Sequence, residues 1–258
     1  MDAADAAPFW RQMPVEAIPS KAKLHGAFLE AFRRLAAGGR VLDLGCGDGR
    51  LTCELAVEFE DLAFQGIDIN AGGIEAARSR AASLPARKDG GPHASFDVAD
   101  VADEAAVAEA AATSAGLDAV LVQLVLSVVG GVERRRALLR GIGRRLSPGG
   151  RLLLSASGAS EDINEQYAEL YRQDEPLTGE YRTYYSRSKD GEVLYPTHHF
   201  TELELRELLE SEGYRVEQIL CEREASSRRP DQAAWFLYAI ASRAEPRPAV
   251  SLGPRGSA

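Results

Sequence analysis

The chain has 258 residues, 45% of them hydrophobic, and a formal net charge of −9 at pH 7. This hydrophobic content is ample for a packed core, and no apolar run approaches the roughly 18 residues that a membrane span needs. The negative charge argues against a nucleic-acid partner, because proteins that bind a phosphate backbone usually display clustered Lys and Arg. The N-terminus has no basic start followed by an apolar core, so we expect a cytoplasmic protein with no membrane partner.

Strand-like apolar runs alternate with helix-like stretches, a pattern typical of an α/β fold with a parallel sheet. The pattern predicts strands over residues 40–44, 63–69, 94–98, 119–124, 150–156, 214–220 and 234–241. It predicts helices over residues 50–59, 72–83, 104–114, 132–146 and 202–212. Seven strands are enough for one doubly wound sheet.

Three segments do not follow this alternation of strands and helices. Residues 1–37 predict an arm or lid, with a helical stretch that packs on the sheet or covers its edge. Within the expected main domain, residues 38–244, an insert at 157–200 carries six of the eight tyrosines and is expected to cover the substrate. The tail, residues 245–258, is expected to be disordered.

The cysteines give no sign of a disulfide framework or a metal centre. Cys46, Cys53 and Cys221 are few and unevenly spaced, and the sequence has no CxxC pair. This usage favours reduced thiols, and we expect no bound metal.

The segment VLDLGCGDGR, residues 41–50, places Gly45, Gly47 and Gly49 directly after a predicted strand. Glycine lacks a Cβ and accepts positive φ, so the chain can approach a ligand closely, and the following helix offers free N–H groups. A dinucleotide fingerprint, GxGxxG, would need its third glycine at position 50, which is Arg50. The GxGxG spacing therefore fits NAD poorly.

Two acids follow the next two strands. Asp68 lies in GIDIN, residues 66–70, and Asp100 follows the third strand. A carboxylate at the position of Asp68 can accept hydrogen bonds from both hydroxyls of a ribose, and Asp100 can accept one from an adenine amino group. With the glycine loop, these acids predict an adenosine pocket along the carboxyl ends of three strands.

These motifs resemble those of class I S-adenosylmethionine (SAM)-dependent methyltransferases. The resemblance extends through ADV at 99–101, LDAVLVQLVLSVV at 117–129 and LSPGGRLLLS at 146–155, and resumes in HFTELELRELLESEGYRV at 199–216. It implies a Rossmann-like, doubly wound sheet of seven strands, mostly parallel, with the last strand antiparallel. It also implies SAM as cofactor and S-adenosylhomocysteine as product.

The resemblance assigns cofactor contacts to particular residues of this chain. They are Asp43, Gly45, Cys46 and Gly47 at the methionine part, Asp68 at the ribose, Ile69, Asp100 and Val101 at the adenine, and Gln123 and Leu124 at the methionyl end. Each has a structural alternative: Asp43 as an acid that organises the loop, Asp100 as a turn residue, Gln123 as a capped strand end and Cys46 as a small buried side chain.

Methyl transfer from a sulfonium depends mainly on alignment and needs a base only when the acceptor must lose a proton. Residues 181–200 predict a β-hairpin that turns at 188–191 and ends in His198 and His199. These histidines, with Tyr184, are the candidate catalytic residues. Alternatively, the histidines only lead into a helix with a capping box of Thr201 and Glu204, and the tyrosines form a pocket wall or lid.

The sequence thus predicts a methyltransferase that acts on a small molecule, with O- or N-methylation expected. One alternative is a tRNA or protein methyltransferase that uses a basic patch at Arg182 and Arg187. Another is a SAM-binding sensor without catalysis, although a sensor needs no second, aromatic pocket. A monomer or a homodimer is expected.

Overall fold

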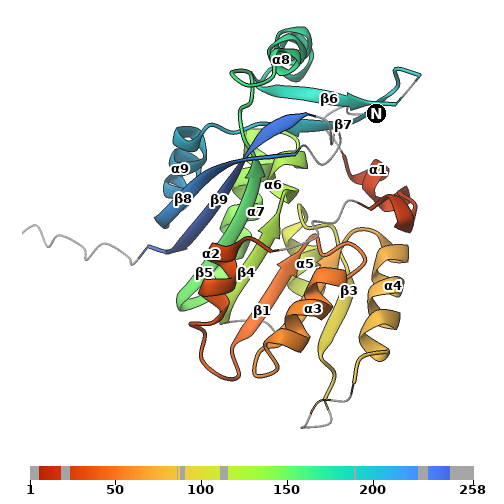
Figure 1. Ribbon diagram of the computed structural model, residues 1–258, viewed down its shortest axis with the longest axis vertical. Coiled ribbons are helices and arrows are strands. Elements are labelled where there is room, and N and C mark those ends of the chain that lie inside the picture. The colour runs from red at the N-terminus through yellow and green to blue at the C-terminus, as the bar shows by residue number, and fades with distance from the viewer. Residues whose placement is uncertain are drawn as a thin grey trace, which may run out of the picture.

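A seven-stranded sheet with the order β3-β2-β1-β4-β5-β9-β8 forms the centre of the computed structural model (Figure 1). The structure describes residues 6–18, 24–85, 87, 91–110, 116–188, 190–225 and 232–244. The strands are β1 (Arg40–Leu44), β2 (Ala63–Asp68), β3 (Ala94–Val98), β4 (Leu117–Gln123), β5 (Leu146–Ser157), β8 (Tyr214–Ala225) and β9 (Ala233–Arg243). β1 to β5 are parallel, whereas β9 runs antiparallel to both of its neighbours. The predicted fold class is confirmed.

Side chains that alternate along the central strands pack into two separate hydrophobic cores. On β4, Val120 and Val122 point into one core, and Ala119 and Leu121 into the other. This follows from the two-residue period of a strand, and it explains why residues 119–122 of β4 and 152–154 of β5 are uninterrupted apolar runs. The sheet is therefore covered on both faces.

Helices from different parts of the chain cover the two faces. They are α1 (Ala7–Gln12), η1 (Val15–Ala17), α2 (Gly26–Phe32), α3 (Arg50–Glu58), α4 (Ala71–Ala82), α5 (Glu104–Ala110), α6 (Val125–Val128), α7 (Val132–Arg145), α8 (Glu165–Thr178) and α9 (Glu202–Ser211). Side chains of α2, α3 and α4 enter one core, and those of α5, α7 and α9 enter the other. None of the described helices has both the length and the apolar character needed to cross a membrane.

The strand order reverses direction beside β1, and this fixes where a ligand can bind. The chain moves outward from β1 to β2 and β3, then returns to place β4 on the other side of β1. Loops after β1 and β4 consequently leave the sheet in opposite directions, which opens a crevice at their carboxyl ends. The glycine loop lies at this crevice.

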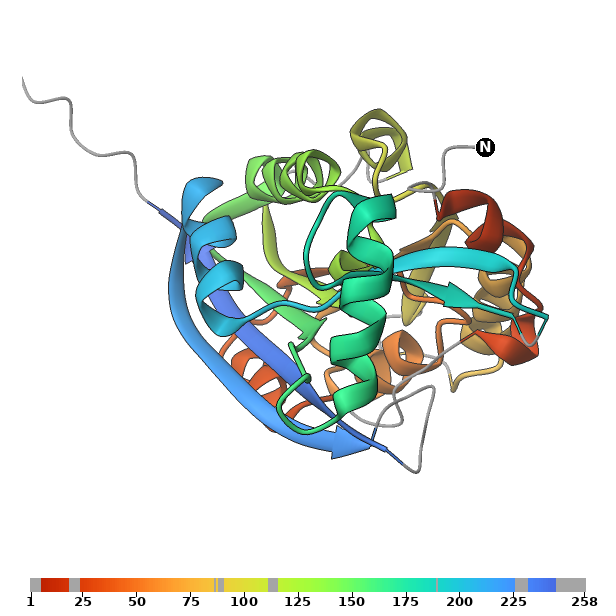
Figure 2. The ribbon, with the colours of Figure 1, turned by 90° about the horizontal axis from the view of Figure 1, so that it is seen from above.

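The insert forms a helix and a hairpin above the carboxyl ends of the strands. Figure 2 shows α8 lying across the top of the sheet beside β6 (Thr183–Arg187) and β7 (Val193–His198). Buried Asp174 on α8 accepts hydrogen bonds from Arg187 at 2.8 and 2.5 Å and from the Tyr185 N–H at 2.8 Å. Burial alone would raise the pKa of Asp174, but the hydrogen bonds and charge of Arg187 outweigh it and lower that pKa. The helix and the hairpin are thus one unit.

Most expected elements have the expected position, with differences at their ends. β5 starts four residues before the expected residue 150, and β8 continues five residues beyond residue 220. The hairpin is confirmed, but α8 was not expected. The last residues of the helix expected at 104–114, and the tail at 245–258, lie outside the described residues.

Leu153 lies at the centre of β5 between β4 and β9 and is fully buried. We expect Leu153→Ala to reduce the free energy of unfolding by about 2–5 kcal/mol, because the change removes apolar contacts and leaves a cavity. Urea denaturation checks this. Leu203→Ala, at a position that is 63% exposed, is the control and should change stability by less than about 0.5 kcal/mol. Equal losses in both variants would contradict this description of the core.

Candidate active site

The glycine loop passes so close to its neighbours that side chains do not fit. A Cβ on Gly45 would lie 2.3 Å from the Val125 side chain, and one on Gly49 would lie 2.5 Å from the Ala77 Cβ. Both glycines also have positive φ, at 80° and 68°. The Gly45 and Cys46 N–H groups donate to the Ile67 carbonyl at 2.7 and 3.2 Å, which fixes the loop on β2. These constraints explain the spacing of the motif.

Asp43 lies beneath this loop and is not among the described residues that line the cavity. Its carboxylate is 4% exposed and accepts a hydrogen bond from the Thr52 hydroxyl at 2.6 Å. Burial raises the pKa of Asp43 to about 6, the Thr52 hydrogen bond opposes the rise, and the charge of Asp68 adds to it. The position supports its alternative role as an acid that organises the loop.

Asp68 and Asp100 line the cavity at the ends of β2 and β3. Asp68 accepts from the Gly47 N–H at 2.9 Å and from the Asn70 N–H at 2.8 Å, so its two oxygens connect the loop after β1 with the loop after β2. Burial raises the pKa of Asp68, although these hydrogen bonds lower it in part. Asp100 accepts from the Ala102 N–H at 2.9 Å.

A single cavity of about 1270 Å³ connects the remaining predicted cofactor residues. Besides the two acids, its walls include Gly45, Cys46, Gly47, Ile69, Val101, Gln123 and Leu124. Leu124 has a φ of 59° and its N–H donates to the Ser155 carbonyl at 2.9 Å. A left-handed leucine is strained, and such strain is concentrated at functional sites. Nine of the ten predicted cofactor residues thus surround one cavity.

The N-terminal arm closes the cavity from one side. The Asn70 side chain donates to the Trp10 and Met13 carbonyls at 2.9 and 2.8 Å, while its oxygen caps α4 at Gly73. Arg11 forms a 3.4 Å ion pair with Asp100. Sequence reasoning missed Asn70, although an Asn directly before a predicted helix is a common N-cap.

Aromatic residues of the insert form the far wall. Tyr167, Tyr184 and His199 line the cavity, and the Tyr167 ring lies 4.8 Å from the His199 ring, centroid to centroid. His199 Nδ1 lies 2.7 Å from the Tyr171 hydroxyl, and its Nε2 lies 3.5 Å from the Tyr184 hydroxyl. The centroids of the Trp10 and Tyr195 rings lie 4.8 Å apart, so the arm and the hairpin are in contact, and both residues line the cavity.

His198 is separated from its neighbour. It is 1% exposed, is not among the described residues that line the cavity, and contacts Thr183 and Glu204 through its two ring nitrogens. Both nitrogens are therefore engaged away from any bound acceptor. The geometry supports His199 and Tyr184 as catalytic candidates and gives His198 a different task.

The sequence profile of a family described as "Methyltransferase domain" matches residues 35–213. The chain belongs to this family. A SAM-dependent methyltransferase from Methanosarcina mazei is similar, with 25% sequence identity and a TM-score of 0.72 over 86% of this chain and 100% of that one. A search of curated protein sequences found no significant match.

Two further solved structures share the methyltransferase fold at lower identity. The structure reported for conversion of a disulfide bond into a thioacetal group during echinomycin biosynthesis is 20% identical, with a TM-score of 0.60 over 95% of this chain and 93% of that one. The CcbJ methyltransferase from Streptomyces caelestis is 17% identical, with a TM-score of 0.57 over 94% and 98% of the two chains.

The methyltransferase uses SAM and releases S-adenosylhomocysteine, and the residues present fit this cofactor. SAM carries a sulfonium and an ammonium group. Burial has raised the pKa of both Asp43 and Asp68, and a nearby cation would favour their charged forms. Trp10 Nε1 is buried without a hydrogen-bond partner among the described residues, and Trp10 lines the same cavity. A ligand with acceptor atoms would satisfy it.

We expect Asp68→Ala to weaken SAM binding by about 1–3 kcal/mol, because a charged acceptor for hydroxyl groups is lost. Isothermal titration calorimetry measures the effect. Glu75→Ala, an exposed acid on α4, removes the same charge close by and should leave the affinity unchanged. An unchanged affinity in Asp68→Ala would mean that the ribose lies elsewhere.

Asp43 also makes stability depend on pH. Because its folded pKa, about 6, lies above the ordinary value of 3.8, the folded state holds the proton more tightly, and stability falls as pH rises from about 4 to about 6. Asp43→Asn should therefore stabilise the SAM-free protein by roughly 1–3 kcal/mol at about pH 7.5. This gain should shrink below about pH 5. Thermal unfolding of both proteins across this range measures it, and a gain that does not vary with pH would contradict the account.

Proposed function

We propose that this methyltransferase transfers the methyl group of SAM to a small-molecule acceptor, by O- or N-methylation, in the chamber beneath α8 and the β6–β7 hairpin. The single observation that supports this most is the continuity of the cavity. It runs from the glycine loop to an aromatic wall, and the chain's own arm and insert close over it. An acceptor must reach into this partly covered cavity, which favours a small molecule over a macromolecule.

The basic residues of the hairpin also favour a small acceptor. Arg182 pairs with Glu161 at 2.7 Å, and Arg187 pairs with Asp174 at 2.5 Å. Their charges are thus compensated within the protein. The patch on which a tRNA or protein substrate would depend is correspondingly weak.

Bound SAM supplies an electrophilic methyl group, and the chain supplies alignment and a proton acceptor. The aromatic wall holds an acceptor against the cofactor end of the cavity and excludes water. Burial raises the pKa of Tyr171, which keeps its phenol protonated. In the tautomer in which His199 Nδ1–H donates to Tyr171, Nε2 carries the lone pair, and it can take a proton from an acceptor beside Tyr184.

This proposal predicts that His199→Ala lowers turnover by at least about tenfold without changing SAM affinity, because a base is lost while the cofactor residues remain. A panel of phenols, carboxylic acids and amines, with detection of S-adenosylhomocysteine, first identifies an acceptor. Tyr181→Phe, an exposed tyrosine of the same insert, is the control and should keep the wild-type rate.

Two results would contradict the proposal. Equal rates in His199→Ala and the control would give His199 a structural role. Micromolar SAM binding with no turnover on any acceptor would instead favour a sensor.

A further inference from the structure

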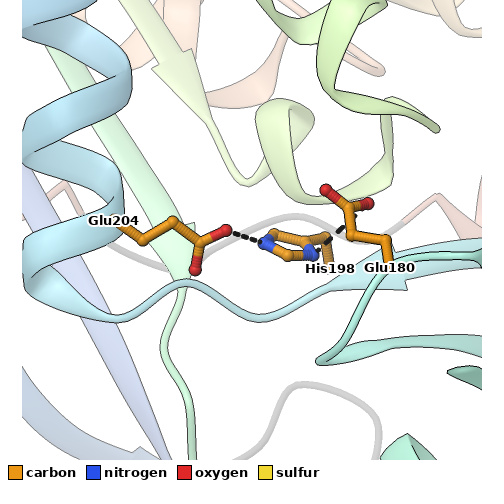
Figure 3. A group of neighbouring side chains, drawn as sticks. All are labelled: Glu180, His198 and Glu204. Carbon is orange, nitrogen blue, oxygen red and sulfur yellow. Dashed lines mark hydrogen bonds and ion pairs between the residues drawn. The ribbon is translucent and has the colours of Figure 1, made fainter.

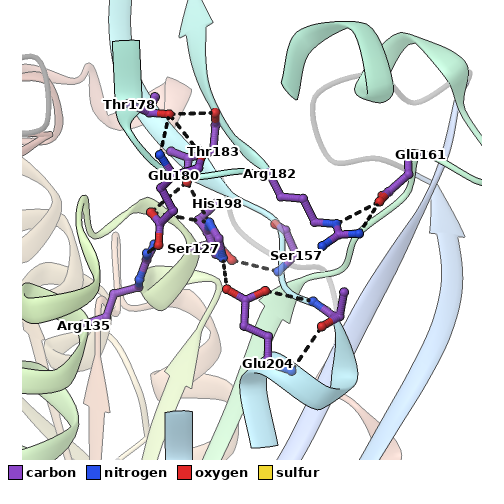
Figure 4. Close-up of polar contacts among 11 residues, drawn as sticks. Ser127, Arg135, Ser157, Glu161, Thr178, Glu180, Arg182, Thr183, His198 and Glu204 are labelled. Carbon is purple, nitrogen blue, oxygen red and sulfur yellow. Dashed lines mark hydrogen bonds and ion pairs between the residues drawn. The ribbon is translucent and has the colours of Figure 1, made fainter. Parts of the chain in front are cut away.

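A partly buried polar cluster joins the insert to the rest of the fold, apart from the cavity. Its centre is His198 at the end of β7, flanked by Thr183 of β6 and by Glu180 of the loop after α8 (Figure 4). From the core, Glu204 of α9 contacts the ring and Arg135 of α7 pairs with Glu180. Three segments of the insert thus meet two core helices at one imidazole.

Hydrogen-bond accounting determines which atoms in this cluster carry protons. The Thr183 hydroxyl lies 2.8 Å from Glu180 Oε2 and 2.7 Å from His198 Nδ1. A hydroxyl has one proton, and an ionised carboxylate can only accept. Thr183 therefore donates to Glu180 and accepts from Nδ1–H. On the other side of the ring, Nε2 lies 2.8 Å from Glu204 Oε1, so Nε2–H donates there.

Each carboxylate in this accounting has a basic side chain beside it. Glu180 contacts the guanidinium of Arg135, which is 1% exposed. Burial would raise the pKa of Glu204, but the hydrogen bond and charge of the histidine outweigh it and lower that pKa. Nearby, Arg182 and Glu161 compensate each other. If the ring were neutral, the two carboxylates, whose side chains are 25% and 39% exposed, would share the single positive charge of Arg135.

We propose that His198 is held as an imidazolium that locks the insert onto the core and so positions His199 and Tyr184 in the cavity. The positioning role rests on the proposed function, whereas the charge and the lock do not. Each ring nitrogen donates to a different partner, and the added charge makes the cluster neutral. Loss of the Nδ1 proton would force Thr183 to donate to the ring and would break its bond to Glu180, whereas loss of the Nε2 proton would remove the bond to Glu204.

The same three side chains, Glu180, His198 and Glu204, lie close enough to be considered as metal ligands. Figure 3 shows the two carboxylates at opposite sides of the ring, each facing its own nitrogen. One ion can be coordinated by only one ring nitrogen, and the Arg135 guanidinium already neutralises Glu180. The geometry therefore suits two ring protons better than a cation.

Nitrogen-15 NMR of the histidine rings tests the charge directly. At about pH 7.5, where an ordinary histidine with a pKa near 6.5 is mostly neutral, both ring nitrogens of His198 should carry protons. His198→Gln assigns the signals. A ring with one unprotonated nitrogen at this pH would overturn the proposal, and so would added Zn²⁺ that displaces the ring protons.

Glu204→Gln tests the lock, because glutamine keeps the size and shape of the side chain but removes its charge and one of its two acceptor oxygens, so it cannot accept both from Nε2–H and from the Thr201 N–H of the capping box. Glu207→Gln, on the exposed side of the same helix, is the matched control. We expect amide hydrogen exchange across residues 165–200 to be at least about threefold faster in Glu204→Gln than in the control. The imidazolium signals of Glu204→Gln should disappear at a lower pH than in the wild type.

Equal exchange in the two variants would overturn the lock. Neither readout uses an acceptor or methyl transfer. A failure of the proposed function would therefore leave these results interpretable, and a neutral His198 would leave methyl transfer at His199 untouched.

Discussion

The cost of burying carboxylates at the ends of β1 and β2 is the constraint on which the site depends. Asp68 lies close enough to Asp43 for its negative charge to disfavour ionisation of Asp43. The principal hydrogen-bond partners of the two carboxylates are one hydroxyl group and backbone N–H groups. Close packing at the glycine loop leaves no room for a basic side chain. A cationic ligand relieves the cost, so the fold is stabilised by the molecule that it binds.

The cavity also needs walls that come from outside the sheet. The crevice beside β1 is open by topology, and the strands provide only its floor. Asn70 ties the arm to the start of α4, whereas the Asp174–Arg187 pair makes α8 and the hairpin one body. The two covers then meet through aromatic contacts at Trp10 and Tyr195.

The sequence was sufficient to predict the fold and to select nine residues that the structure places around one cavity, because both predictions depend on local patterns. Strand period, turn residues and the GxGxG spacing are all read within about ten residues. Asp43 was harder to place. Whether its side chain lines the cavity or lies beneath the glycine loop depends on the position of Thr52 of α3, which donates a hydrogen bond to it. The polar cluster could not be predicted, since its members are brought together from distant positions in the chain. Even so, α8 had local signals: Asn164 caps its start and Gly179 ends it.

The two adjacent histidines show what a local pattern can and cannot decide. Consecutive residues of a strand point to opposite sides, so His198 at the end of β7 and the following His199 were never equivalent candidates. One ring enters a buried network of charges, and the other faces Tyr184 in the cavity. The alternation predicts that they differ. Which of them lines the cavity depends on the side on which α9 places Glu204, and this is a property of the assembled fold.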